Sequence, residues 1–233
     1  MKSWIKEAAI IAIGLCMLGL SINSAIRAFV NKERVVSVKG LAEMEVEANK
    51  VTWPIAFKEV GNDVQQLYKS INEKSKVVVA FLKENGIADS EISVNPAEVV
   101  DMDAERYSNN NNQYRYISTS VITVTSTNVK LVRKLISEQT ALLQKGVVVT
   151  GSDYRYNVNY EFTGLNDIKP GMIEEATKNA RAAAEKFAKD SDSKLGKIKR
   201  ANQGQFSIYD RDINTPYIKT VRVVTSIDYY LNN

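Results

Sequence analysis

Two acidic clusters are the candidates for metal chemistry in this sequence. Residues 210–214 begin like a calcium-binding EF-hand loop, with oxygen-bearing side chains at alternate positions. Thr215 stands where that loop needs glycine for its sharp turn, and a valine replaces its final bidentate glutamate. The second cluster, Asp101, Asp103 and Glu105, fails the same pattern. We therefore interpret both clusters as solvated acids of hairpins and expect no bound metal.

The residue types needed for much ordinary catalysis are absent. The chain has no histidine, and its one cysteine, Cys16, lies inside an apolar run. Histidine-based acid–base catalysis, Ser-His-Asp and Cys-His nucleophiles, and Cys/His zinc sites are therefore excluded. An enzyme working with carboxylates alone would need two acids that converge in a cleft with displaced pKa values. We expect a protein that is not an enzyme and that uses no cofactor.

Alternating tyrosines suggest one possible ligand groove. Residues 146–162 have the pattern of a single long strand, which would place Tyr154, Tyr156 and Tyr160 on one face. Alternating aromatic residues in a half-buried strand usually belong to the core. A groove for a small apolar or peptide ligand remains the alternative.

The charge distribution argues against nucleic acid as a partner. Of the net charge of +4, three units come from residues 1–32, where four cations face one anion. The rest of the chain is close to neutral, whereas a nucleic-acid binder concentrates basic residues on its folded domain. The short basic run of Lys194, Lys197, Lys199 and Arg200 is expected at a helix end, where cations are favourable.

The N-terminal segment is long and apolar enough to cross a membrane. Residues 8–26 contain no charged side chain and would span roughly 28 Å as a helix, close to the thickness of a bilayer core. A cleaved signal peptide has a shorter apolar core and small residues before the cut, and Ser24-Ala25-Ile26 is a poor cleavage site. We expect an uncleaved signal anchor over residues 1–32 that contacts lipid through residues 8–26. Secretion after cleavage is the alternative.

The remainder, residues 33–233, is predicted to be one α+β domain. Short strands and amphipathic helices follow one another in the order of a split βαβ unit, with an antiparallel or mixed sheet backed by helices. Residues 34–40 and 42–48 look like a strand pair. Pro54 predicts an edge or a bulge in the next strand, because it cannot donate to a ladder. Helices are predicted from about residue 62 to Gly86 and from Asn128 to Gly146.

A stripe of alanines marks a third helix, predicted from about residue 166 to Lys194 with Gly196 as its C-cap. Small side chains at intervals of four allow a helix backbone to approach a sheet or another helix closely. We interpret the stripe as a packing surface, and a partner-binding surface in an oligomer is the alternative. Its members are Ala176, Ala180, Ala183, Ala184, Phe187 and Ala188.

These segments together resemble the SIMPL-domain family, long carried as a domain of unknown function, which includes bacterial periplasmic immunogenic proteins. The resemblance rests on VVSVKGLAEMEVEANKVTW, on a helix ending in GI, and on EEATKNARAAAEKFA followed by KLGKI, and it covers nearly all of residues 34–231. Many members carry a Pro-Asp pair where this chain has residues 48–50. The resemblance implies a βα domain exported to the periplasm, in some members assembled into ring-shaped oligomers, and it supplies no catalytic residues.

The sequence thus predicts a single-pass protein of the bacterial inner membrane whose C-terminal domain lies in the periplasm. Its expected role is self-association or scaffolding at the cell envelope, as a homo-oligomer. The alternative is a periplasmic binding module for a small apolar or peptide ligand.

Overall fold

The computed structural model describes residues 2–32, 34–104, 113–151 and 153–232. The chain divides into two compact units, where the sequence suggested one domain over residues 33–233. Unit 1 comprises Met1–Met44, Asn166–Ile208 and Val221–Asn233, and unit 2 comprises Glu45–Leu165 and Tyr209–Thr220.

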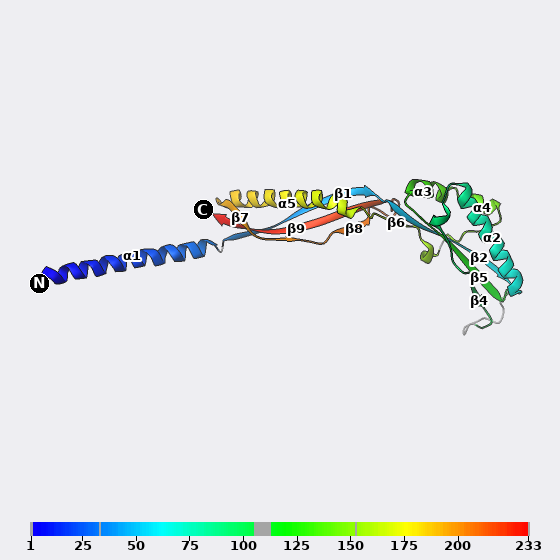
Figure 1. Ribbon diagram of the computed structural model, residues 1–233, viewed down its shortest axis with the longest axis horizontal. Helices are drawn as coiled ribbons and strands as arrows, with labels where there is room; N and C mark the ends of the chain where they lie inside the picture. Colours follow the sequence, from blue (N-terminus) through cyan, green and yellow to red (C-terminus); the bar gives the residue numbers. More distant parts are fainter. Residues whose placement is uncertain (1, 33, 105–112, 152, 233) are drawn as a thin grey trace. The chain divides into compact units, whose positions relative to one another are not determined.

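The first helix, α1 (Lys2–Lys32), carries the apolar N-terminal segment (Figure 1). The stretch Glu7–Arg27 is long and apolar enough to cross a membrane, and none of it is buried against the rest of the protein. The predicted apolar helix is therefore present, with its side chains exposed.

A four-stranded sheet, most of which belongs to unit 1, has the order β1 (Val35–Glu47), β9 (Ile218–Asn232) and β7 (Lys194–Gln203), with β8 (Ser207–Asp210) also paired with β9. The Arg34 carbonyl accepts a hydrogen bond from Leu231 N at 2.9 Å, and Ser37 Oγ donates to Asp228 Oδ1 at 2.7 Å. Because the partner in β9 moves from Leu231 to Asp228 as β1 advances from Arg34 to Ser37, the two strands are antiparallel. The predicted strand pair at residues 34–48 is wrong, because those residues form one continuous strand.

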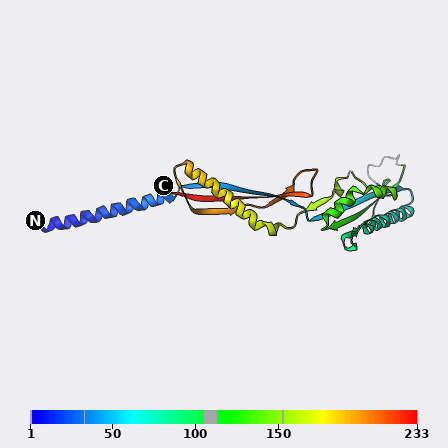
Figure 2. The same cartoon turned by 90° about the horizontal axis from the view of Figure 1, so that it is seen from above.

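Helix α5 (Leu165–Asp190) lies along one face of this sheet (Figures 1 and 2). Gly40 lies inside β1, where its missing side chain leaves room for the backbone of α5. A Cβ at that position would lie 1.8 Å from the Ala176 carbonyl oxygen and 2.5 Å from Ala180 N, so only glycine lets the helix backbone pass this close. Four alanines of the stripe are buried, Ala183 is half-buried, and Phe187 is exposed over 59% of its surface.

The end of α5 differs from the prediction. The helix ends at Asp190, and Asp192 takes a positive φ of 49° where Ser193 N donates to the Ala188 carbonyl at 2.8 Å. Such a left-handed residue closes a helix by bonding its last carbonyls. Gly196 is therefore no cap but a residue of β7, where an added Cβ would lie 2.8 Å from the Tyr230 carbonyl oxygen of β9.

Unit 2 contains a five-stranded sheet in the order β3 (Ile92–Val94), β5 (Tyr116–Ser126), β2 (Lys50–Gly61) and β6 (Asn159–Glu161), with β4 (Glu98–Asp101) also paired with β5. Each described pairing is antiparallel. The α2 (Val64–Glu84), α3 (Val129–Ser137) and α4 (Thr140–Gln144) helices pack on one face of the sheet (Figure 1). The α+β class, with antiparallel sheets backed by helices, is thus confirmed.

Residues 89–101 form the short helix η1 (Asp89–Glu91), β3 and β4, and Pro96 lies between the two strands, because it cannot donate to the ladder. One strand prediction in unit 2 needs correction. The expected long strand over residues 146–162 is wrong: it is replaced by a single bridge at Val149, the short helix η2 (Tyr154–Tyr156) and β6. Asp153 starts η2 by accepting a hydrogen bond from Arg155 N at 3.1 Å, which turns the chain away from an extended path.

Candidate functional site

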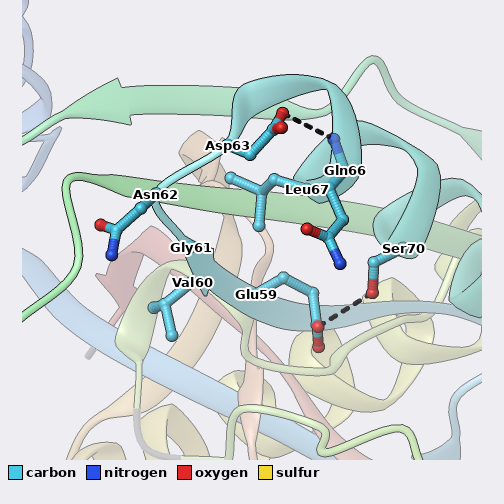
Figure 3. Close-up of a pocket in the computed structure, with 8 residues that line it drawn as sticks. All are labelled: Glu59, Val60, Gly61, Asn62, Asp63, Gln66, Leu67 and Ser70. Carbon is cyan, nitrogen blue, oxygen red and sulfur yellow. Dashed lines mark hydrogen bonds between the residues drawn. The ribbon is translucent and has the colours of Figure 1, made fainter.

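A small polar hollow lies in unit 2 where β2 runs into α2 (Figure 3). Its volume is about 220 Å³. The lining residues are Glu59, Val60, Gly61, Asn62, Asp63, Gln66, Leu67 and Ser70.

The acids of this hollow already have partners in the fold. Glu59 Oε2 accepts from Ser70 Oγ at 3.1 Å, and Glu59 also forms an ion pair with Lys74 of α2. Asp63 is the N-cap of α2, and its Oδ1 accepts from the backbone N of Gln65 at 2.8 Å. Both carboxylates are therefore bound to residues of α2.

A larger and more apolar hollow, about 560 Å³ in volume, runs beside α2 at the edge of the unit 2 sheet. One flank of the helix and one residue of β3 form it. The lining residues are Asn72, Ser75, Lys76, Val79, Ala80, Lys83 and Val94. Ser75 is one of its polar lining residues, and Ser75 Oγ donates to the Ile71 carbonyl at 2.8 Å. This hollow combines three aliphatic side chains, Val79, Ala80 and Val94, with two lysines.

The tyrosines proposed to line a groove do not come together. Tyr154 is 83% exposed on η2, whereas Tyr160 is buried in the core, with its ring 6.2 Å from that of Tyr217 in an edge-to-face arrangement. Burial raises the pKa of the Tyr160 hydroxyl, with the nearby Arg133 acting in the opposite direction. The cause of the separation is η2, since residues of a short helical turn do not share a face as alternate residues of a strand do.

An exposed ion pair lies beside Tyr154. The Arg155 guanidinium contacts Asp153, with Nη2 2.7 Å from Oδ2, and lowers the pKa of that carboxyl to about 2. Both residues border an open hollow together with Lys58 and Thr150. This pair satisfies the local charges of the η2 turn.

The first acidic cluster is a hydrogen-bonded turn. Asp212 Oδ1 accepts from the backbone N of Asn214 and of Thr215, both at 2.8 Å, and Oδ2 accepts from the Thr215 hydroxyl. That hydroxyl is the main cause that lowers the pKa of Asp212 to about 2. Asp210 pairs with the buried ammonium of Lys219. The carboxylates thus stabilise the turn.

The second acidic cluster is an ion pair at the end of β4. Asp101 Oδ2 accepts from Arg115 Nη2 at 2.8 Å, and this bond lowers the pKa of Asp101. Asp103 bonds through its backbone N to Asp101 Oδ1 at 3.1 Å. Glu105 lies outside the described residues. Within the described residues, no group of three His, Cys, Asp or Glu side chains is placed to hold a metal ion.

The basic run lies on a strand and not at a helix end. Lys194, Lys197, Lys199 and Arg200 belong to β7 and are exposed. The Lys199 ammonium lies 5.8 Å from the centre of the Tyr230 ring of β9, which gives it a cation–π partner. The helix-dipole explanation for these residues is therefore wrong.

The hollow beside α2 was not predicted from the sequence, although part of its signal was visible. Asn72, Lys76, Val79 and Lys83 follow a helical spacing beside the buried stripe of α2. The sequence does not show that Val94 lies beside this flank of α2, because the pairing of β3 with β5 places Val94 there.

Comparison with protein families identifies the chain. The family SIMPL, described as "Protein of unknown function (DUF541)", matches residues 36–222, which is most of the chain. The chain belongs to the SIMPL family. Comparison with the curated proteins gave no significant match. The SIMPL match spans residues of both units and begins beyond the exposed apolar helix α1.

Proposed function

We propose that this SIMPL protein is a membrane-tethered component of the bacterial cell envelope that acts without catalysis, by associating with further copies of itself. Helix α1 is the tether in the inner membrane, and residues 33–233 work on the periplasmic side.

The exposed apolar surface of α1 is the main support for the membrane tether. Every described side chain of Glu7–Arg27 is exposed, including Ile10, Leu15 and Leu18, each more than half exposed. At ~1.5 Å per residue this stretch is about 30 Å long, which matches the hydrocarbon core of a bilayer. Apolar surface of this extent is stable only when lipid or protein covers it.

The outer edge of β1 supports self-association. Because Arg34 bonds to β9, the alternation of an antiparallel ladder turns the backbone groups of Ser37, Lys39 and Leu41 toward the other side. The position of Asn179 agrees with this, since its Nδ2 donates to the Leu41 carbonyl at 2.8 Å. The Leu41 carbonyl is thus already bonded to α5. The outward backbone groups of Ser37 and Lys39 form the part of the edge on which a second copy can pair.

The use of the acids in unit 2 supports a role without catalysis. Glu59, Asp63, Asp101 and Asp212 each accept hydrogen bonds that hold a helix, a strand end or a turn. Their negative charges are therefore compensated by structural partners.

The tether is tested by sodium carbonate extraction of membranes and by the intact mass of the extracted protein. We expect the chain to stay in the membrane pellet with residues 1–32 attached. A soluble chain that has lost those residues would overturn the tether.

Self-association is tested on the full chain in a nonionic detergent. Native mass spectrometry should show one defined multimer, and a monomer at all concentrations would contradict the proposal.

Cysteines placed at Val35, Ser37 and Lys39 in a Cys16→Ser background then report on the β1 edge. We expect oxidation to cross-link copies through at least one of them. Lys199→Cys on β7, on the other side of β9, is the matched control and should not cross-link.

A further inference from the structure

The strand β3 has open backbone groups at the edge of the unit 2 sheet. Asn95 N donates to the Val121 carbonyl at 3.1 Å, which continues the ladder between β3 and β5. In an antiparallel ladder, residues that bond to the neighbouring strand alternate with residues whose N–H and C=O point away from it. Val94 and Ile92 therefore direct their backbone groups away from β5. The Ile92 N–H donates to the Asp89 carbonyl, so the groups open for pairing are those of Val94.

The side chain of Val94 continues the core face to this edge. It lies directly opposite Ile122, which is fully buried beneath the helices. Cross-strand partners in a sheet point to the same face. Val94 nevertheless remains 53% exposed, because no strand in the described part of the chain lies beyond β3. One more strand would complete the layer.

Helix α2 supplies a wall along the same edge. Its flank from Asn72 to Lys83 borders the 560 Å³ hollow together with Val94, and Val79 and Ala80 form the apolar middle. The flank is roughly 16 Å long at ~1.5 Å per residue, which matches about five residues of extended chain at ~3.3 Å each.

The charge of the hollow is positive. Lys76 and Lys83 are the charged residues among those that line it. Lys83 Nζ lies 2.5 Å from Asp89 Oδ1, whereas Lys76 makes no ion pair with any residue that the structure describes. A carboxylate that entered the hollow would therefore meet an available ammonium group.

We infer that β3 and the flank of α2 form a binding site for an extended peptide segment of another protein. The segment adds a strand to β3 and bonds to the backbone of Val94. One aliphatic side chain lies between Val94 and Val79, and an acidic side chain two residues away, on the same face of the added strand, contacts Lys76. Main-chain hydrogen bonds supply affinity in this mode, and the alternate side chains supply specificity.

The test uses the full chain in detergent and a fluorescein-labelled nonapeptide of the sequence STDTITDTS. Its central isoleucine and both aspartates share one face when the peptide is extended. Fluorescence anisotropy should show saturable binding, and hydrogen exchange should show new protection of the Val94 amide. The peptide STKTITKTS, with lysines for the aspartates, should bind about tenfold more weakly.

Two substitutions separate the backbone bond from the side-chain contact. Val94→Pro removes the outward N–H but no bond to β5, so we expect it to abolish binding while the fold is retained. Val94→Ala keeps the N–H and loses only aliphatic contact, so it should weaken binding a few-fold. Circular dichroism melts of both variants check that the sheet is intact.

The charge contact is tested with a matched pair of variants. Lys76→Glu should weaken binding of STDTITDTS about tenfold, whereas Lys130→Glu, an equal change of charge on α3 outside the hollow, should leave it unchanged. Equal binding by the Lys76→Glu and Lys130→Glu variants would overturn the inference, as would no binding at millimolar peptide. Protection of the Val94 amide before peptide is added would also overturn it, since a second copy would then occupy the edge.

Discussion

The Thr215 hydroxyl controls the titration of Asp212. Its hydrogen bond is the largest of the causes that lower the pKa of that carboxyl from an ordinary 3.8 to about 2. Because the folded-state pKa is depressed, the turn contributes stability that is fully present above about pH 4 and is lost as the pH falls toward 2. We predict that Thr215→Val raises the Asp212 pKa toward its ordinary value, measured by carboxyl-carbon NMR titration.

Thr215→Ser is the matched variant for this prediction, because it keeps the hydroxyl and removes only the methyl group. Its Asp212 titration should stay near the wild-type midpoint. If the serine and valine variants titrate alike, the hydroxyl is not the cause of the lowered pKa.

At the scale of the element, the docking of α5 on β1 depends on the absence of a side chain at Gly40. In Gly40→Ala the new methyl carbon would overlap the Ala176 carbonyl and Ala180 N, both of which are backbone atoms of the helix. The helix must then move away from the sheet. We predict a loss of about 1–3 kcal/mol in the free energy of unfolding, measured by urea denaturation.

Gly171→Ala is the matched control, since this glycine lies in the same helix and an added Cβ would have no atom within 4 Å. Alanine is a better helix former than glycine, so this variant should gain about 0.5–1 kcal/mol. The two glycine substitutions are expected to have opposite signs, and a similar effect from both would mean that the close contact at Gly40 is not decisive.

At the scale of the whole molecule, the two units have separate hydrophobic cores. Leu135 belongs to the core of unit 2, and Ile227 to the core of unit 1. Each is buried, and truncation to alanine costs about 2–5 kcal/mol in such sites. We predict that Leu135→Ala speeds amide hydrogen exchange in β5 more than in β9, and that Ile227→Ala does the reverse. Equal acceleration in both sheets for either variant would show one cooperative unit instead of two.

Patterns that depend on neighbours in the chain were readable from the sequence. The apolar run of α1, the glycine that ends α2 and the alanine stripe of α5 all follow from local spacing, because a helix bonds residues four apart. Asn128 was likewise readable as the cap of α3, and its side chain accepts from Leu131 N at 3.1 Å. These signals predict the helices of the α+β class and the apolar segment, and they contribute to the resemblance to the SIMPL family, which the family match over residues 36–222 confirms.

The tertiary structure alone decided which surfaces are covered and which remain open. Gly40 looks like a turn residue until α5 is placed against it, and Val94 looks like a core residue until β3 proves to be the last strand of its sheet. The reason is physical. A periodic pattern shows which face of an element is buried. It does not show which distant segment covers that face, because strand order and hydrogen bonds between distant segments depend on long-range contacts.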